Sequence, residues 1–267
     1  MRDFARGFFL LLAVAAVWCV AARAQASWPA QGGGLGNMET AAGQILALTN
    51  QARAQAGVGR LQWDPALAAA ALYHCQRMAA EGPISHQYRG EPDLSSRAAQ
   101  AGAHFSVIEE NVGFAPSASA VHQAWMQSPG HRENLLSPDV DHVGVAVVAA
   151  RGEFYAVADY SRAVEQMSAS QVEARVAALI RVSGVAILRD PSMARTSCTS
   201  DAGMPRTAGG PMPRFIMRWQ DADLTRLPQA LVEKLASGNY RQAAVGSCPA
   251  QIAEGSFTAY RVAVLLF

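Results

Sequence analysis

Residues 125–136 read WMQSPGHRENLL, and this stretch decides how the rest of the chain is interpreted. Its Ser128-Pro129 pair is typical of a helix start, because serine caps free backbone N–H groups and proline suits the first helical turn. The stretch therefore predicts a short helix over residues 129–135, directly after a helix over 119–127. His131 then lies in the first turn of the short helix, where a polar side chain can reach a cleft.

Helices are predicted before this stretch and strands after it. Apolar residues recur at helical spacing over 39–56, 65–81 and 94–101, and Gly82-Pro83 ends the second of these segments. A strand with alternating valines follows over 142–148, and a second strand is predicted over 154–160. Helices followed by paired strands indicate an α+β fold in which helices cover a sheet.

The composition changes after Arg162, and a second, smaller α+β unit is predicted there. We expect one domain over residues 39–162 and another over 163–267, whose role the sequence does not indicate. No internal sequence repeat relates the two. In the second unit the sequence predicts helices over 170–182 and 223–236, strands over 185–188, 215–219, 240–245 and 257–266, and a long loop over 191–213.

The N-terminus has the pattern of an export signal. Two arginines precede an apolar run from Phe8 to Ala22, which is short for a membrane span of ~20 residues. Small residues at 24–26 predict cleavage before Ser27, so residues 1–26 are expected to be a signal peptide and 27–38 a flexible lead-in. The alternative is an uncleaved N-terminal anchor. With cleavage, no membrane span remains, and the protein is expected outside the bacterial cytoplasm, secreted or in the periplasm or envelope.

Composition excludes some classes of partner. The 267 residues are 51% apolar and 16% charged, which is typical of a globular chain with a sizeable core. There are 22 basic and 21 acidic residues, so nothing favours nucleic acid as a partner.

The cysteines predict one disulfide. Cys198 and Cys248 both lie in turn-rich sequence of the last third, and an exported protein meets oxidising conditions. Cys75 shares the apolar stripe of a predicted helix with His74. We therefore expect a Cys198–Cys248 disulfide, a reduced Cys75 packed as a small hydrophobe, and a partly buried, hydrogen-bonded His74.

Polar residues gather at element ends in three places of the first unit: around His86, at Glu110-Asn111, and around His131. Two histidines and a carboxylate that converge can bind a divalent metal. They can equally form a hydrogen-bonded cluster that holds helices together. The sequence has neither an H-E-x-x-H nor a C-x-x-C motif, so no local metal motif decides between these interpretations.

From about Ile45 to Tyr160 the chain resembles the CAP (SCP-like) superfamily, the fold of cysteine-rich secretory proteins, antigen 5 and plant pathogenesis-related proteins. The motifs occur in the family's order: N-x-x-R at Asn50–Arg53, L-x-W-D-x-x-L at Leu61–Leu67, the first histidine at His86, E-N-V-G at Glu110–Gly113, the bacterial W-M-x-S-P-G-H-R-x-N at 125–134, and V-G-V at Val143–Val145. The resemblance implies an α-β-α sandwich of the short bacterial secreted type.

The resemblance also implies a cleft lined by His86, Glu110, Asn111 and His131. In eukaryotic members two histidines and two glutamates share this cleft, and Ser128 stands here at the position of the second glutamate. Glu109 precedes Glu110, but neighbours on an extended segment point in opposite directions. The implied metal set is therefore His86, His131 and Glu110, with zinc as the expected divalent metal and no cofactor otherwise.

Three functions follow from these observations. The favoured one is a non-catalytic exported module whose cleft binds a lipid, a glycan or another envelope component. The second is a metal-assisted hydrolase that uses His86, Glu110 and His131. The third is a structural envelope protein whose polar cluster only holds the fold together. No catalytic residue is assigned.

Overall fold

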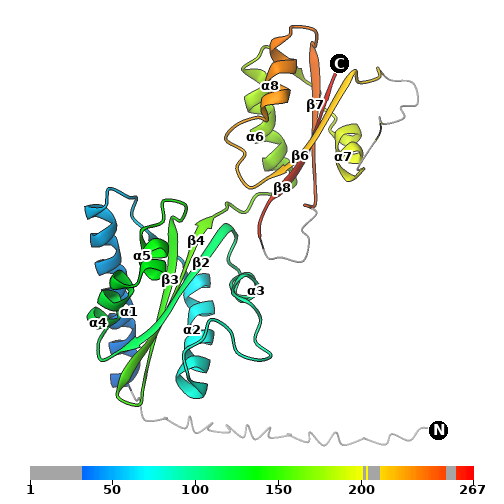
Figure 1. Ribbon diagram of the computed structural model, residues 1–267. Coiled ribbons are helices and arrows are strands. Elements are labelled where there is room, and N and C mark those ends of the chain that lie inside the picture. Colours follow the sequence, from blue (N-terminus) through cyan, green and yellow to red (C-terminus); the bar gives the residue numbers. More distant parts are fainter. Residues whose placement is uncertain (1–31, 201–202, 204–210, 251–256) are drawn as a thin grey trace, which may run out of the picture.

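The chain contains two four-stranded sheets, each with its own helices (Figure 1). The computed structural model describes residues 32–200, 203, 211–250 and 257–267. The predicted signal peptide and residues 27–31 lie outside these ranges. The first helix begins at Gly32, so the prediction of a flexible lead-in is wrong for residues 32–38. No helix within the described ranges is both long and apolar enough to cross a bilayer.

The first sheet has the strand order β1-β3-β4-β2, and its elements, which we call the first unit, end with β4 at residue 163. The short β1 runs parallel to β3, and the other pairings are antiparallel. Its elements are α1 (Gly32–Gln55), β1 (Gln62–Trp63), α2 (Pro65–Glu81), α3 (Leu94–Gln100), β2 (Phe105–Ala115), α4 (Ala118–Gln127), α5 (Pro129–Leu136), β3 (His142–Ala150) and β4 (Glu153–Ala163).

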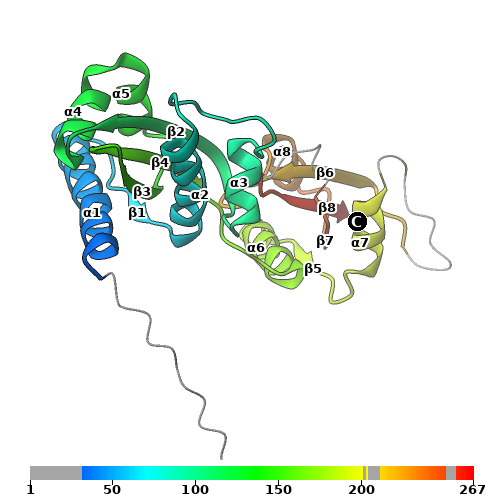
Figure 2. The same ribbon diagram turned by 90° about the horizontal axis from the view of Figure 1, so that it is seen from below.

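Helices cover both faces of this sheet, as the predicted α-β-α sandwich requires (Figure 2). Helices α1, α4 and α5 bury Ile45, Trp125 and Leu135 against one face. On the other face, α2 packs Cys75 and Met78 against β3 and β4. Because strand side chains alternate between faces, β2 presents Glu110 toward the α2 side and Glu109 toward α5.

The second unit forms a sheet of order β5-β7-β8-β6. Helices α6 and α8 pack on one face of it and α7 on the other. The elements are α6 (Ala169–Arg181), β5 (Ala186–Ile187), α7 (Ser192–Thr199), β6 (Phe215–Asp221), α8 (Gln229–Ala236), β7 (Gln242–Cys248) and β8 (Tyr260–Leu266).

Two predictions for this unit are wrong. Helix α7 lies inside the segment predicted as a loop, because the Asp190 side chain accepts a hydrogen bond from the Ser192 backbone N–H and starts a helix. Helix α8 starts at Gln229 rather than at residue 223. Side-chain-to-backbone turns at Asp221 and Asp223 and the extended Pro228 keep the preceding residues out of the helix.

The predicted disulfide is confirmed: Cys198 of α7 and Cys248 of β7 are bonded, with their Cα atoms 5.8 Å apart. Cys75 is reduced and buried.

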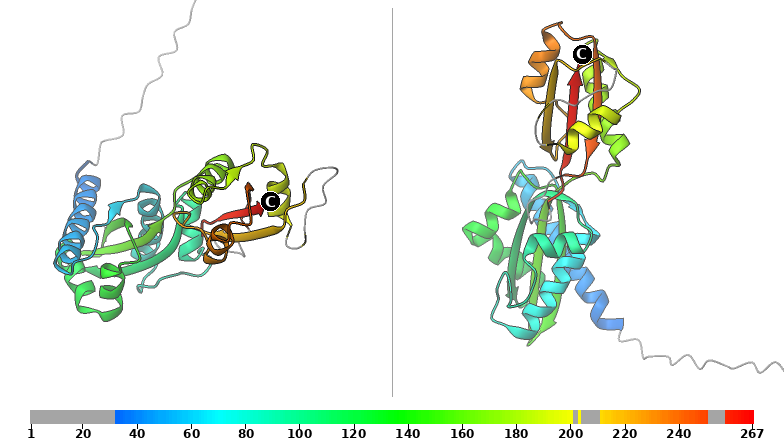
Figure 3. Two further views of the ribbon diagram at one scale, coloured as in Figure 1. Left: turned by 90° about the horizontal axis from the view of Figure 1, so that it is seen from above. Right: turned by 90° about the vertical axis from the view of Figure 1, so that its right-hand side faces the viewer.

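The two sheets lie end to end (Figure 3). The Phe105 and Phe257 rings meet edge to face at 5.3 Å, and the Thr258 N–H donates to the Phe105 carbonyl oxygen at 2.7 Å.

Candidate functional site

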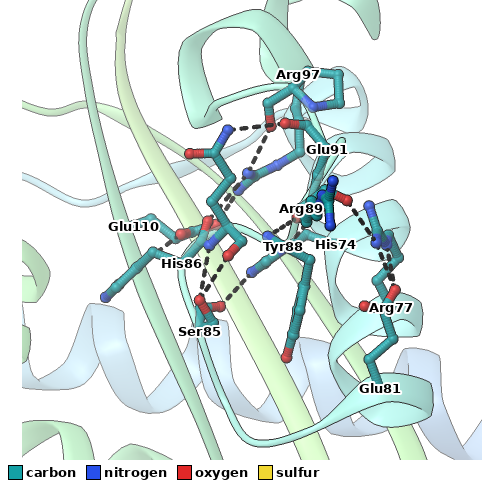
Figure 4. Close-up of polar contacts among 12 residues, drawn as sticks. His74, Arg77, Glu81, Ser85, His86, Tyr88, Arg89, Glu91, Arg97 and Glu110 are labelled. Atoms are coloured by element: carbon teal, nitrogen blue, oxygen red, sulfur yellow. Dashed lines mark hydrogen bonds and ion pairs between the residues drawn. The ribbon is translucent and has the colours of Figure 1, made fainter.

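The candidate site lies along β2, the edge strand of the first sheet. The loop that follows α2 carries His86 to this edge, and His86 Nδ1 lies 2.8 Å from Glu110 Oε1 (Figure 4). The Glu110 side chain is buried, whereas the His86 side chain is 61% exposed. The imidazole therefore sits at the surface with one nitrogen held by a buried carboxylate.

Arg97 of α3 fixes the other side of the same carboxylate. Its guanidinium pairs with Glu110 Oε2, and its Nη1 donates to the His86 and Pro92 carbonyl oxygens, each at 3.3 Å. Arg97 is itself only 3% exposed. One buried cation thus orients Glu110 and anchors the backbone that carries His86.

A second buried pair holds this loop from the α2 side. His74 Nδ1 lies 2.8 Å from Glu91 Oε1, and His74 Nε2 lies 2.8 Å from the Ser85 carbonyl oxygen. Glu91 Oε2 also accepts a hydrogen bond from the Tyr88 N–H at 2.9 Å. The prediction that His74 is hydrogen-bonded is confirmed, and the residue is completely rather than partly buried. Its bond to Ser85 fixes the residue before His86.

Asp159 lies directly across the sheet from Glu110, in the adjacent strand β4. It is completely buried, and neither carboxyl oxygen has a hydrogen-bond partner among the described residues. Burial and the nearby charge of Glu110 raise the pKa of Asp159 well above its usual value. The protonated form of Asp159 is therefore favoured beside the Glu110 carboxylate.

Helix α5 supplies the opposite side of the site. The Asn111 amide donates to the His131 carbonyl oxygen at 2.9 Å, and the Asn134 amide donates to Asn111 Oδ1 at 3.0 Å. These bonds tie the helix to β2. Asn111 thus positions the backbone around His131, and its side chain is completely buried.

A cavity of about 260 Å³ lies between the edge strand and this helix pair. Its walls are mainly apolar, with the exposed Ile84 and Phe114 beside the buried Trp125, and with Ser128 and His131 as its polar members. The structure joins His86 directly to Glu110. His131 lies in the cavity wall, where burial, followed by the charge of the nearby His86, lowers its pKa.

The predicted metal set does not fit a metal ion in this arrangement. In the described part of the chain no three His, Cys, Asp or Glu side chains gather closely enough to bind one. Glu110 is already paired with the Arg97 cation, which opposes a second cation on the same carboxylate. Glu109 cannot substitute, because it points to the other face and accepts from Ser137 Oγ at 3.2 Å.

The two histidines should titrate on opposite sides of the ordinary value of about 6.5. The hydrogen bond to Glu110 raises the pKa of His86, whereas burial, followed by the charge of His86, lowers the pKa of His131. NMR titration should therefore show His131 deprotonating first as pH rises. Glu110→Gln should move the His86 pKa downward, because it removes the carboxylate that raises it.

The two histidines affect the stability of the fold in opposite ways as pH changes, because their pKa values are shifted in opposite directions. The contribution of His86 is fully present below about pH 6.5 and is lost as pH rises through its raised folded pKa, whereas His131 destabilises the fold as pH falls below about 6.5. If both imidazoles titrate together near 6.5, or if Glu110→Gln leaves His86 unchanged, the described contacts do not exist in solution.

Sequence comparison agrees with this geometry. The sequence model of the cysteine-rich secretory protein family, CAP, matches residues 46–160. This part of the chain is a CAP domain. The match includes α2 to α5, β2 and β3, and therefore every residue of the candidate site.

Two curated relatives from Bacillus subtilis match the CAP domain. An uncharacterized membrane protein, YlbC, is 33% identical over 105 residues, which are 39% of this chain and 30% of YlbC. An uncharacterized protein, YkwD, is 30% identical over 106 residues, which are 39% of this chain and 41% of YkwD. The chain thus matches less than half the length of each relative.

Among solved structures, an extracellular protein with an SCP domain from Bacillus anthracis is 27% identical, with a TM-score of 0.44 over 47% of this chain and 41% of that chain. A cysteine-rich secretory protein from Staphylococcus aureus is 20% identical, with a TM-score of 0.41 over 48% and 40% of the two chains.

Sequence reasoning predicted His86, Glu110, Asn111 and His131 as site residues but did not single out Arg97 and Asp159, which the structure places beside Glu110. Asp159 had a readable signal, because an acidic residue in the otherwise apolar strand around Val157 is unusual. Arg97 had none, since nothing in its short helix distinguishes it from a surface arginine.

Proposed function

We propose that the CAP domain is an exported binding module and that the cavity between β2 and the α4–α5 pair takes the ligand. The ligand is a lipid, a glycan or another envelope component with an apolar face and one group that hydrogen-bonds to imidazole. We infer that the module lies outside the cytoplasm from the signal peptide predicted for residues 1–26. In this proposal residues 39–162 form the binding domain and 163–267 a separate domain.

One observation carries the proposal. Glu110, which Arg97 orients, holds His86 through Nδ1, so Nε2 is left for a ligand near His131, the histidine that lines the apolar cavity. No described residue hydrogen-bonds to that nitrogen. Ligand sites typically combine apolar walls with a few fixed polar groups, and this site has that composition.

The chemistry favours binding over catalysis. A serine, threonine or cysteine nucleophile is typically activated by a base within hydrogen-bond reach. Within the described ranges neither His86 nor His131 has such a partner. The Cys75 thiol is buried and donates to the Tyr155 carbonyl oxygen at 3.1 Å, and burial raises its pKa to about 12. Metal-assisted hydrolysis would need a metal that the donor set does not fit.

Native ligand capture tests the proposal. The full chain, expressed for export, is purified, and its bound small molecules are extracted and identified by mass spectrometry. We expect a stoichiometric ligand whose occupancy falls at least about tenfold in His86→Ala. His142→Ala is the matched control, since His142 also bonds a carboxylate, Asp141 at 2.8 Å, but away from the cavity.

Other outcomes contradict the proposal. A ligand retained equally in both histidine variants would place binding elsewhere. Stoichiometric zinc that is lost only in His86→Ala would support the hydrolase. An absence of both ligand and metal, with unchanged folding in His86→Ala, would support a purely structural role.

A further inference from the structure

The second unit repeats the topology of the CAP domain. Both sheets have a two-residue strand parallel to its neighbour, followed by two antiparallel pairings, in the orders β1-β3-β4-β2 and β5-β7-β8-β6. Along the chain α6, α7 and α8 occupy the places of α1, α2 and α4. The two units thus share a topology, although no internal repeat is found in the sequence.

Local landmarks recur at matching places. A glycine with positive φ follows the first helix of each unit, Gly57 at 73° and Gly184 at 76°. An Asp-Pro pair then precedes the second helix, Asp64-Pro65 in one unit and 190–191 in the other. In the third strand, Gly144 and Gly246 each face the backbone of that second helix so closely that a Cβ atom would clash.

The register defines which residues correspond. The row Gly144, Asp159 and Glu110 crosses the first sheet, and the row Gly246, Ala263 and Arg218 crosses the second. Arginine and alanine thus stand where the CAP domain has its two site carboxyls. All six histidines of the chain precede residue 143. The second unit therefore lacks the acid–histidine chemistry of the first.

A cavity nevertheless recurs beside the edge strand. In the CAP domain it lies between β2 and the helices that follow, and in the second unit a cavity of about 540 Å³ lies between β6 and the start of α8. Trp219, Asp221, Asp223, Arg226 and Gln229 line it. Trp219 corresponds in register to Asn111.

We propose that this cavity is a second binding site, for a neutral saccharide. An indole gives an apolar surface for the C–H face of a sugar ring. Carboxylate, guanidinium and amide groups around it offer both acceptors and donors for hydroxyl groups. The two carboxylates lining the cavity disfavour an anionic ligand, and the arginine disfavours a cationic one. This inference does not depend on the ligand of the CAP cavity.

Calorimetric titration of the full chain with N-acetylglucosamine tetramer and with cellotetraose tests the inference. At least one tetramer should bind, and Trp219→Ala should weaken it at least tenfold. Trp63→Ala is the matched control, because Trp63 is 43% exposed on the first unit. Arg226→Ala removes an exposed hydrogen-bonding group without disturbing the core and should weaken binding severalfold, whereas Arg189→Ala, also exposed, should not.

The inference is overturned if neither tetramer binds, or if the Trp63 and Arg189 controls lose as much affinity as the cavity variants. Loss of binding in His86→Ala alone would place the sugar in the CAP cavity instead. The His86→Ala and Trp219→Ala variants therefore report on the two sites separately.

Discussion

Replacing Arg53 by methionine should lower the free energy of unfolding of the CAP domain by at least about 4 kcal/mol. The Arg53 side chain is buried, and its guanidinium donates to four carbonyl oxygens: Gly59 at 2.6 Å, Leu135 at 3.0 Å, Ser137 at 2.9 Å and Val140 at 3.2 Å. Each buried acceptor left without a donor costs about 1–3 kcal/mol. Methionine fills similar space but donates no hydrogen bond.

Urea unfolding measures this loss, with Arg60→Met as the control, since Arg60 is exposed on the following segment. Arg53→Lys should recover little, because one ammonium group cannot reach four acceptors in the fork geometry of a guanidinium. A change for Arg53→Met within about 1 kcal/mol of the Arg60 variant would show that water replaces the guanidinium at these carbonyls.

Arg53 also connects stability to the site. Its bonds to the carbonyls of Leu135 and Ser137 fix the end of α5, and α5 carries His131. The same helix is tied to β2 through Asn111 and Asn134. The cavity wall is therefore held at both ends by buried polar bonds, which suits a preformed binding site.

Helix starts and the central strands were readable from sequence because their signals are local. Asp64 accepts hydrogen bonds from the Ala66 and Leu67 N–H groups, and Pro65 follows it in the first turn, as the sequence indicates. The valines of β3 alternate with Gly144 and Ala146 because α2 packs so closely on that face that a Cβ atom on Gly144 would clash. Such signals depend on neighbours within about four residues.

Strand β2 was not predicted from the sequence, and the reason is functional. It is an edge strand with three successive polar residues. Glu109 accepts a hydrogen bond from Ser137, Glu110 bonds to His86, and Asn111 donates to a backbone carbonyl oxygen of α5. Polar side chains on both faces remove the alternation that identifies a strand. The family motif located Glu110, but the pairing of that residue with Asp159 depends on strand register, which no local pattern contains.

The second unit shows the same limit. Its α6, β6 and β8 were predicted from local periodicity, yet its relation to the CAP domain is invisible in the sequence because few equivalent residues are identical. The residues that both units share are those that the backbone geometry requires. They are the positive-φ glycine after the first helix, the Asp-Pro helix start, and the glycine under the second helix.

The glycine that lies under the second helix predicts a second large effect on stability. In the CAP domain, Gly144→Ala should lower the free energy of unfolding by at least about 4 kcal/mol. A Cβ atom on Gly144 would lie 2.0 Å from the Ala68 backbone nitrogen and 2.2 Å from the Leu67 carbonyl carbon. These are helix backbone atoms, so α2 as a whole would have to move off the sheet. Overpacking alone costs about 1–3 kcal/mol, and a backbone clash exceeds that range.

Gly246→Ala should destabilise the second unit comparably, because its Cβ would lie 2.2 Å from the Arg195 nitrogen and 2.3 Å from the Ala194 carbonyl carbon. Gly43→Ala is the control with the opposite sign. It is an exposed helical position with no atom within 4 Å, where alanine should stabilise by up to about 1 kcal/mol. Thermal and urea unfolding measure all three variants.

Gly144→Ala should also weaken the CAP site, since displacing α2 shifts His74 and hence the Ser85 carbonyl that it holds. If Gly144→Ala or Gly246→Ala is as stable as Gly43→Ala, the second helix and the strand do not approach each other as closely as described in that unit.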